Sequence, residues 1–440
     1  MPSPARSAGP AREVLRLAVP ALFALMAEPA FLLADSAIVG RLGMVPLAGL
    51  GVASAVLTTA AGVFVFLAYG TTASVARRAG AGDLRAALGL GVDGLWLAAA
   101  LGVVTGTALM ALAHPVAAVF GASPAATAAA TSYLAVSAAG VPAMLVVLAC
   151  TGVLRGLRDT RTPLVVAVLG FGANIVLNVA LVYGAGLGLV GSALGTVLAQ
   201  NAMAAALVAV VVRGVRRHRA PLGPHLGPVL RAARDGLPLL VRTLALRAAL
   251  LLTTWVAASG GDATLASYQV AATIWTFLAF ALDALAIAAQ SLTGHALGAG
   301  NVAGARALTT LMLRWGVGAG AVLGLALLAV HQVLPPLFSP EPAVQTALAS
   351  ALVVVALQQP LAGWVFVLDG VLIGAGDGRW LAWAQVAVLG AYVPLALVAR
   401  AGGVSSAGLW WAFSGFVLAR ALALGWRARG QAWLVVGATR

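Results

Sequence analysis

Long apolar runs separated by short polar loops dominate the chain. A helix needs about 20 mainly apolar residues to cross a bilayer, and every run reaches that length. The runs are too long for the ~10-residue alternating strands of an outer-membrane barrel. We therefore expect twelve transmembrane helices, at residues 15–40, 47–76, 87–113, 127–154, 163–184, 189–212, 236–258, 264–294, 304–331, 343–373, 380–399 and 405–426.

Composition places the chain in the same class. Of its 440 residues 62% are hydrophobic and 9% charged, and the mean hydropathy is +1.02. Such values are typical of an all-α polytopic membrane protein. The first apolar run is too long for the core of a signal peptide, so we expect it to be retained as a span. The single cysteine, Cys150, lies inside an apolar run, which excludes an intramolecular disulfide and a cysteine metal cluster.

The net charge of +14 is carried by arginines in short loops, and the chain has no lysine. This distribution argues against nucleic acid as a partner. With twelve spans, twenty arginines fall on one side of the membrane and only Arg41 and Arg400 on the other. The positive-inside rule predicts that both termini are cytoplasmic, in a bacterial cytoplasmic membrane. The twenty are Arg6, Arg12, Arg16, Arg77, Arg78, Arg85, Arg155, Arg158, Arg161, Arg213, Arg216, Arg217, Arg219, Arg231, Arg234, Arg306, Arg379, Arg427, Arg429 and Arg440.

An internal repeat divides the chain into halves. Residues match at a constant offset of 218, including Pro20 with Pro238 and the loop that starts at Gly80 with the loop that starts at Gly298. Further pairs are Pro142 and Pro360, Gly152 and Gly370, Gly156 and Gly374, Asp159 and Asp377, and Arg161 and Arg379. Six spans is an even number, so the two copies enter the membrane from the same side. Parallel repeats about an axis along the membrane normal are common in transporters.

The repeat gives the expected domains. We expect a six-helix lobe over residues 1–212, a cytoplasmic linker over 213–235, a second six-helix lobe over 236–428 and a tail over 429–440. Two lobes of this kind suggest a cleft at their axis, in which a substrate is exposed alternately to the two sides.

Two carboxylates in the first span require an explanation. Each costs about 2.5–3.5 kcal/mol at membrane depth on insertion scales. Glu28 and Asp35 are seven residues apart and share a helix face, and Pro29 removes a backbone hydrogen bond, which allows a bend. We interpret the span as a bendable helix with a protonatable face that lines a polar cavity. In the alternative, Asp35 makes a structural hydrogen bond and Glu28 satisfies backbone groups freed by Pro29.

Two amides in the fifth span extend this polar set. Asn174 and Asn178 are four residues apart and share a face. Amide side chains both donate and accept hydrogen bonds, so they stabilise a nearby acid in either protonation state. We therefore group them with Asp35 as a candidate ion-coupling site.

The second half contains charges of both signs within its spans. They are Arg242, Arg247, Asp283 and Asp369, and Gln290 follows Asp283 by seven residues on the same face. We favour mutual pairing, because unpaired charges in a bilayer are costly. A role in substrate or ion coupling is the alternative.

No motif indicates an enzyme. The glycine-containing loops lack the Gly-Lys-Ser/Thr ending of a phosphate loop and the strand that precedes it. None of the five histidines has metal-ligand spacing, and no Ser-His-Asp set has plausible depth. We expect no cofactor apart from a coupling H⁺ or Na⁺.

With these residues in view, the chain resembles the multidrug and toxic compound extrusion (MATE) transporters, particularly their DinF-like branch. The resembling stretches are EPAFLLADSAIVGRLG from Glu28, NIVLNVALVYGAGLGLVGSALGTVLAQ from Asn174, RTLALR from Arg242 and ALDALAIAAQSLTGHALGAGN from Ala281. The resemblance covers nearly the whole chain.

The resemblance implies export of organic cations and other amphipathic compounds in exchange for H⁺ or Na⁺. It implies Asp35 as the coupling acid with Asn174 beside it, and Arg242 and Asp283 as polar residues of the second lobe. Many members carry Asp where this chain has Asn178 and Glu where it has Gln290. These departures favour coupling to protons through Asp35 alone.

The preferred hypothesis is thus a secondary antiporter that works by alternating access, as a monomer in the lipid bilayer, on small amphipathic or cationic substrates. The alternative is a flippase for a lipid-linked precursor, from the same superfamily. Such a flippase is expected to have a strongly cationic central cavity, whereas the first half here is acidic. A passive channel is disfavoured because rings of like charges are absent from the sequence.

Overall fold

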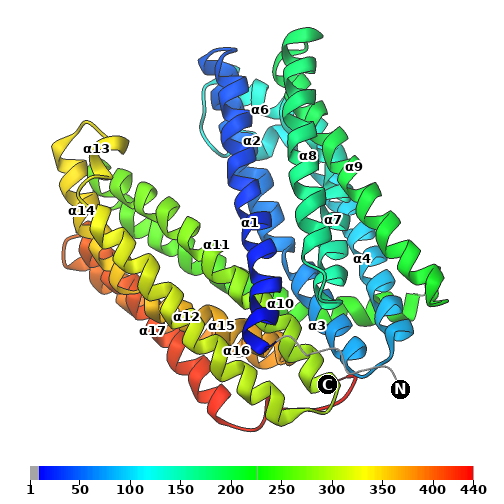
Figure 1. The fold of residues 1–440 in the computed structure, drawn as a ribbon. Helices are drawn as coiled ribbons and strands as arrows, with labels where there is room; N and C mark the ends of the chain where they lie inside the picture. The colour runs from blue at the N-terminus through cyan, green and yellow to red at the C-terminus, as the bar shows by residue number, and fades with distance from the viewer. Residues whose placement is uncertain (1–8, 225, 440) are drawn as a thin grey trace. The chain divides into compact units, whose positions relative to one another are not determined.

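The computed structural model describes residues 9–224 and 226–439, and of Glu28 only the backbone. Arg6, Arg440 and the side chain of Glu28 therefore lie outside the described residues. All regular elements in the described part of the chain are helical (Figure 1). They are α1 Pro10–Gly40, α2 Met44–Phe64, α3 Phe66–Gly80, α4 Leu84–Ala111, α5 Ala113–Ala118, α6 Pro124–Ser137, η1 Ala138–Gly140, α7 Val141–Gly156, α8 Arg161–Val179, η2 Ala180–Gly184, α9 Gly188–Arg217, α10 Leu226–Ala258, α11 Asp262–Gly298, α12 Val302–Val330, α13 Pro335–Phe338, α14 Pro342–Leu357, α15 Gln359–Gly374, α16 Gly378–Ala401 and α17 Ser406–Arg429.

Among the described residues, eleven stretches are long and apolar enough to cross a membrane, and a bent pair of helices makes a twelfth. This confirms the predicted all-α fold with twelve spans. The bent span consists of α14 and α15, which meet at 50° near Gln358. In the first half, the 3₁₀ turn η1 interrupts the corresponding span between α6 and α7. Each break lies just before a proline, Pro142 or Pro360, whose missing N–H prevents a continuous helix.

The chain forms two compact units. The N-terminal unit comprises Phe23–Gly236, and the C-terminal unit comprises the described residues up to Leu22 together with those from Leu237 onward. Both boundaries fall inside helices, in α1 and in α10. The expected linker 213–235 contains the last turn of α9 and the first turns of α10.

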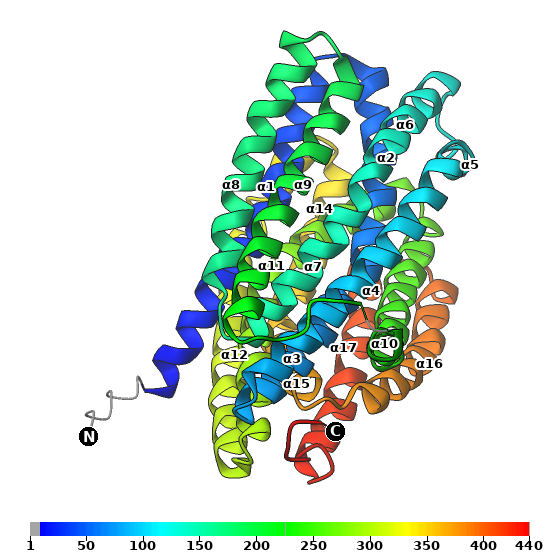
Figure 2. The same ribbon diagram turned by 90° about the vertical axis from the view of Figure 1, so that its right-hand side faces the viewer.

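Apolar side chains of three helices form a core in the N-terminal unit. α4, α7 and α9 contribute Leu88, Val92, Cys150, Val153, Leu154, Leu207, Val211 and Val215 to it. Beside this core, α8 and α9 form a hairpin and lie side by side in Figure 1 and in the turned view of Figure 2.

The internal repeat is preserved in the helix contacts as well as in the sequence. Gly152 of α7 lies against the carbonyl oxygen of Ala68 in α3, and Gly370 of α15 lies against the carbonyl oxygen of Ala286 in α11. Gly152 and Gly370 are 218 residues apart, and so are Ala68 and Ala286. A Cβ at either glycine would overlap the facing backbone, so these close approaches require glycine, as is common between membrane helices. The contact of Gly102 with Pro142 recurs as Gly320 with Pro360.

Candidate functional site

Asp35 is the centre of a polar site in the N-terminal unit. Its Oδ1 accepts hydrogen bonds from Asn178 Nδ2 at 2.8 Å and from Ser192 Oγ at 2.6 Å. Its Oδ2 accepts a longer bond, 3.4 Å, from the hydroxyl of Tyr133. The carboxylate is 3% exposed. Four helices, α1, α6, α8 and α9, thus converge on one buried acid.

Two amide oxygens remain without hydrogen-bond partners at this site. Asn174 donates from Nδ2 to Thr196 Oγ1 at 3.1 Å, and Asn178 donates to Asp35. The Oδ1 atoms of both amides are buried, and neither has a partner among the described residues. An unsatisfied buried acceptor costs about 1–3 kcal/mol. The site therefore combines a carboxylate with two oxygens that are suited to a proton donor or a small cation.

Contacts on both sides of Asp35 fix α1 against α8 and the turn that follows it. One turn before Asp35, Phe31 stacks on Phe171 of α8 with ring centroids 5.2 Å apart. One turn after it, the hydroxyl of Tyr183 donates to the carbonyl of Ile38 at 2.5 Å. Tyr183 belongs to the π-helical turn η2, and single π turns are frequent at functional sites.

Sequence reasoning identified part of this site. The structure brings together the predicted Asp35 and Asn178, with Asn174 one turn further along α8. It adds three residues that the sequence did not single out, Tyr133, Ser192 and Thr196. Ser192 and Thr196 are four apart in an otherwise apolar stretch of α9, and that spacing was the available signal.

The helix α1 is continuous through Pro29, whose role as a hinge stays a prediction. The role of Glu28 also stays a prediction, because its side chain lies outside the described residues.

The C-terminal unit holds its buried acid differently. Arg242 of α10 forms a bidentate ion pair with Asp369 of α15, from Nε to Oδ1 at 3.1 Å and from Nη2 to Oδ2. Arg420 of α17 approaches the same Oδ2 at 3.3 Å. All three side chains are buried. This carboxylate is compensated by two guanidinium groups, whereas no ion pair among the described residues includes Asp35.

The remaining predicted residues lie elsewhere in the C-terminal unit. Asp283 is half-buried on α11, and Gln290 is buried two turns further along the same helix, at the contact with Gly374. Arg247 is exposed on α10.

Comparison with known proteins agrees with this architecture. The family model MatE matches the chain twice, at residues 20–180 and 238–398. These two ranges are again 218 residues apart, so each half of the chain contains one copy.

Three known proteins illustrate the similarity. The chain is 31% identical to the chloroplastic Protein DETOXIFICATION 44 of Arabidopsis thaliana, over 94% of this chain and 81% of that protein. It is 30% identical to the DNA damage-inducible protein F of Escherichia coli, over 82% of this chain and 79% of that protein. The Vibrio cholerae MATE transporter VcmN, solved in a bent form, has a TM-score of 0.86 at 24% identity, over 97% of both chains. The resemblance drawn from the sequence is thereby confirmed.

Proposed function

Because this chain belongs to the MatE family of multidrug and toxic compound efflux transporters, we propose that it is a secondary antiporter that exports amphipathic organic cations in exchange for H⁺ or Na⁺. We also propose that it is a monomer in a bacterial cytoplasmic membrane. Both termini are placed in the cytoplasm because the arginines gather in the loops of one side. Asp35 is the coupling acid in this proposal.

The buried and uncompensated carboxylate of Asp35 carries the proposal. Neutral groups supply its hydrogen bonds, from Asn178, Ser192 and Tyr133. A buried ion without a counter-charge is disfavoured by several kcal/mol, so this site favours uptake of a positive charge. The Oδ1 atom of Asn178 has no partner among the described residues, and a turn of this amide toward Asp35 gives a bound proton or Na⁺ a further acceptor. The site therefore has two states that differ by the bound ion.

The bound ion controls substrate release in two ways, by changing the charge of the site and by changing the shape of α1. When the site faces outward, Asp35 takes up the ion, and the loss of negative charge lowers affinity for a cationic substrate. The same step allows α1 to bend at Pro29, where the missing N–H leaves one carbonyl of the preceding turn without its helical partner. The inward-facing protein then releases the ion and binds the next substrate. The bent form recorded for VcmN supports a second conformation of this kind.

The test is transport in proteoliposomes with H⁺ and Na⁺ gradients imposed independently. Wild type is expected to drive efflux with at least one gradient, and Asp35→Asn to lose the coupled component. Asp83→Asn is a matched control, because Asp83 caps α4 in a loop and Asn301 caps α12 at the equivalent position. Coupled efflux that persists at the wild-type rate in Asp35→Asn would remove this residue from the mechanism.

A further inference from the structure

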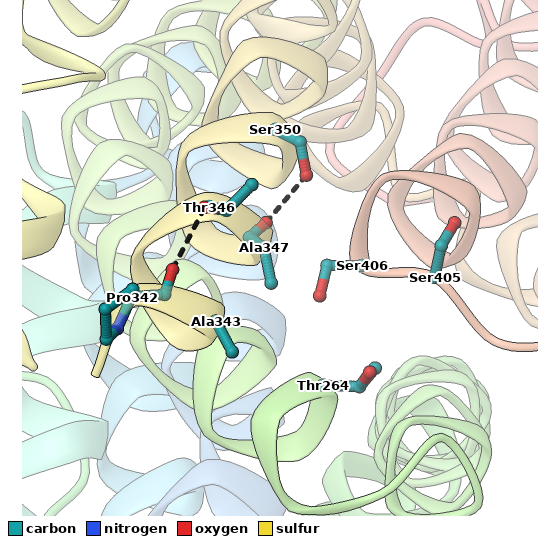
Figure 3. A pocket seen from close by; sticks show the side chains of 8 residues that line it. All are labelled: Thr264, Pro342, Ala343, Thr346, Ala347, Ser350, Ser405 and Ser406. Carbon is teal, nitrogen blue, oxygen red and sulfur yellow. Dashed lines mark hydrogen bonds between the residues drawn. The ribbon is translucent and has the colours of Figure 1, made fainter.

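Two of the cavities among the described residues lie in the C-terminal unit, and their chemistry differs. The first, of about 560 Å³, lies between α11, α14 and α17 and is shown in Figure 3. Hydroxyl groups line much of it, but Thr346 donates to the carbonyl of Pro342 and Ser350 to that of Ala347. Ser406 is bonded to Ser267. These hydroxyls are already engaged within the protein, so this cavity gives little basis for ligand recognition.

The second cavity has about 150 Å³ and aromatic walls. It lies between α10, α11 and α17, and its lining includes Thr253, Tyr268, Trp275, Trp410 and Phe413. We propose that this pocket binds an aromatic ring that carries a hydrogen-bond acceptor, as the aryl group of an exported compound. We call this cavity the aryl pocket.

The walls of the aryl pocket are held by ring-to-ring contacts. Phe413 meets Trp275 and Trp410 edge to face, with centroids 5.3 and 5.4 Å apart. Tyr268 lies 6.0 Å from Trp410. Aromatic pairs in such arrangements contribute about 0.5–1.5 kcal/mol each beyond the area that they bury. A preformed pocket of about 150 Å³ is the size that accommodates benzene in a protein interior, so a single ring fits.

The indole of Trp410 supplies the specificity for an acceptor. Its side chain is 2% exposed, and its Nε1–H has no hydrogen-bond partner among the described residues. The hydroxyl groups around Trp410, in contrast, have hydrogen-bond partners: Thr253 is bonded to Tyr392 at 2.7 Å and Thr254 to Tyr268 at 3.1 Å. A buried donor without an acceptor costs about 1–3 kcal/mol. Nε1 itself has almost no free surface, so the indole turns toward the cavity when a ligand carbonyl, ether or ring nitrogen binds there, and the new hydrogen bond removes that cost.

The aryl pocket is related by the repeat to the Asp35 site. Thr253 and Tyr392 follow Asp35 and Asn174 by 218 residues, within the two ranges that match the family model. The carboxylate of the first copy is thus a neutral hydroxyl in the second copy, and no charged residue lines the pocket. We infer that one copy of the duplicated position retained the ion and that the other copy became a place for an uncharged part of the ligand.

The pocket has an open side along α11. Gln269 and Thr276 line it and are exposed, whereas Tyr268 on the same helix is buried. Gln269 and Thr276 are seven residues apart and therefore mark two turns of one helix face. A ring enters beside these polar side chains, while the rest of a larger compound remains outside.

The test is binding to the purified full-length protein in lipid nanodiscs, measured by ¹⁹F NMR against empty nanodiscs. The probes are 4-fluoroacetophenone and 4-fluoro-isopropylbenzene, which differ by a ketone oxygen in place of a methyl group. Wild type is expected to bind the ketone saturably and about fivefold more tightly than the hydrocarbon, as one hydrogen bond of about 1 kcal/mol implies.

Three variants make the test decisive. Trp410→Phe removes the N–H but keeps a ring, so ketone affinity falls about fivefold and hydrocarbon affinity is unchanged. Trp411→Phe is the matched control, because the Trp411 indole is 57% exposed and does not line the pocket. Both probe affinities are expected to equal those of wild type in this variant. Ala272→Phe fills the cavity and abolishes binding of both probes. If Ala272→Phe does not fold, the comparison of Trp410→Phe with Trp411→Phe decides alone.

The proposal is overturned if wild type shows no saturable binding, or if Trp410→Phe keeps the preference for the ketone. As a statement about exported compounds, this inference rests on the proposed antiport, but the binding assay uses no ion gradient. Asp35→Asn is expected to bind the ketone like wild type while it loses coupled transport. Failure of the aryl pocket and failure of the antiport proposal are therefore seen in separate measurements.

Discussion

Asn178 donates a hydrogen bond of 2.8 Å to Asp35, and the oxygen of the same amide points at Gly195 of the next helix. A Cβ at position 195 would overlap that oxygen. The absence of a side chain at Gly195 is therefore what allows Asn178 to reach the carboxylate. A backbone feature of α9 thus determines the geometry around an acid on α1.

Gly195→Ala is expected to displace the Asn178 amide and weaken coupled transport while the protein still folds. Overpacking of this kind costs about 1–3 kcal/mol, so the melting temperature should fall moderately. The control is Gly172→Ala, at an exposed position of α8 with no atom within 4 Å of an added Cβ. Both variants are measured for melting temperature and for efflux. Equal coupled transport in the two would show that Asn178 does not need its present position.

Asn178→Asp is expected to convert the site toward Na⁺. It places a second carboxylate beside Asp35 in place of the donating amide, so the pair shares a proton when no metal ion is bound. Na⁺ that replaces this proton is bound by two negative carboxylates instead of one. At the effective dielectric of proteins, the added attraction raises Na⁺ affinity about tenfold or more. Na⁺-driven efflux should therefore appear or become stronger. Asn301→Asp makes the same charge change at a helix cap in a loop, and Na⁺ dependence that rises equally in this control would contradict the prediction.

The fold was predictable because hydropathy and helix length are strongly constrained in a membrane. The expected spans 87–113 and 264–294 correspond to α4 and α11 with ends a few residues apart. The break between α14 and α15 was not predicted, since a continuous apolar run from 343 to 373 hides it. At the break, Gln359 Nε2 donates to the carbonyl of Val355 four residues earlier, and the apolar pattern of the sequence does not show this local contact.

Site residues could be predicted only where placing the side chain in a bilayer costs considerable free energy. Asp35 and Asn178 stand out because a carboxylate or an amide in an apolar span needs a reason. Ser192 and Tyr133 do not, because hydroxyl groups in membrane helices usually bond their own backbone, as Thr72 does with Ala68. Which hydroxyls turn to Asp35 is decided by helix packing, and one sequence does not contain that information. The unpartnered indole of Trp410 was equally hidden.

The repeated glycine contacts predict paired effects on stability. Gly152→Ala and Gly370→Ala each push a Cβ into a facing carbonyl oxygen, of Ala68 and Ala286. Each is expected to lower stability by about 1–3 kcal/mol, because backbone cannot move aside as a side chain does. Melting temperature in detergent measures this, with Gly318→Ala in α12 as the control, where an added Cβ meets nothing within 4 Å. A melting temperature unchanged in either glycine variant would show that its helices separate easily.

The ion pairs of the C-terminal unit predict that replacing Asp369 lowers stability more than replacing Asp377 does. Asp369→Asn leaves Arg242 and Arg420 buried without their carboxylate, and breaking a buried pair in this way costs about 3–5 kcal/mol. Asp377→Asn removes the partner of Arg427, whose side chain is 18% exposed and therefore still reaches water, so the loss is that of a charged hydrogen bond, about 1.5–3 kcal/mol. Expression and melting temperature should therefore fall more for the first variant.

The same pair of variants separates a structural role of Asp369 from a coupling role. Since two guanidinium groups already compensate Asp369, it has no need to take up an ion, and Asp35 alone is expected to couple. Asp369→Asn protein that survives purification should thus retain the wild-type response to H⁺ and Na⁺ gradients at a reduced yield. Loss of that response in well-folded Asp369→Asn would instead place a second coupling acid in the C-terminal unit. The two guanidinium groups would then act as gates that release Asp369 during transport.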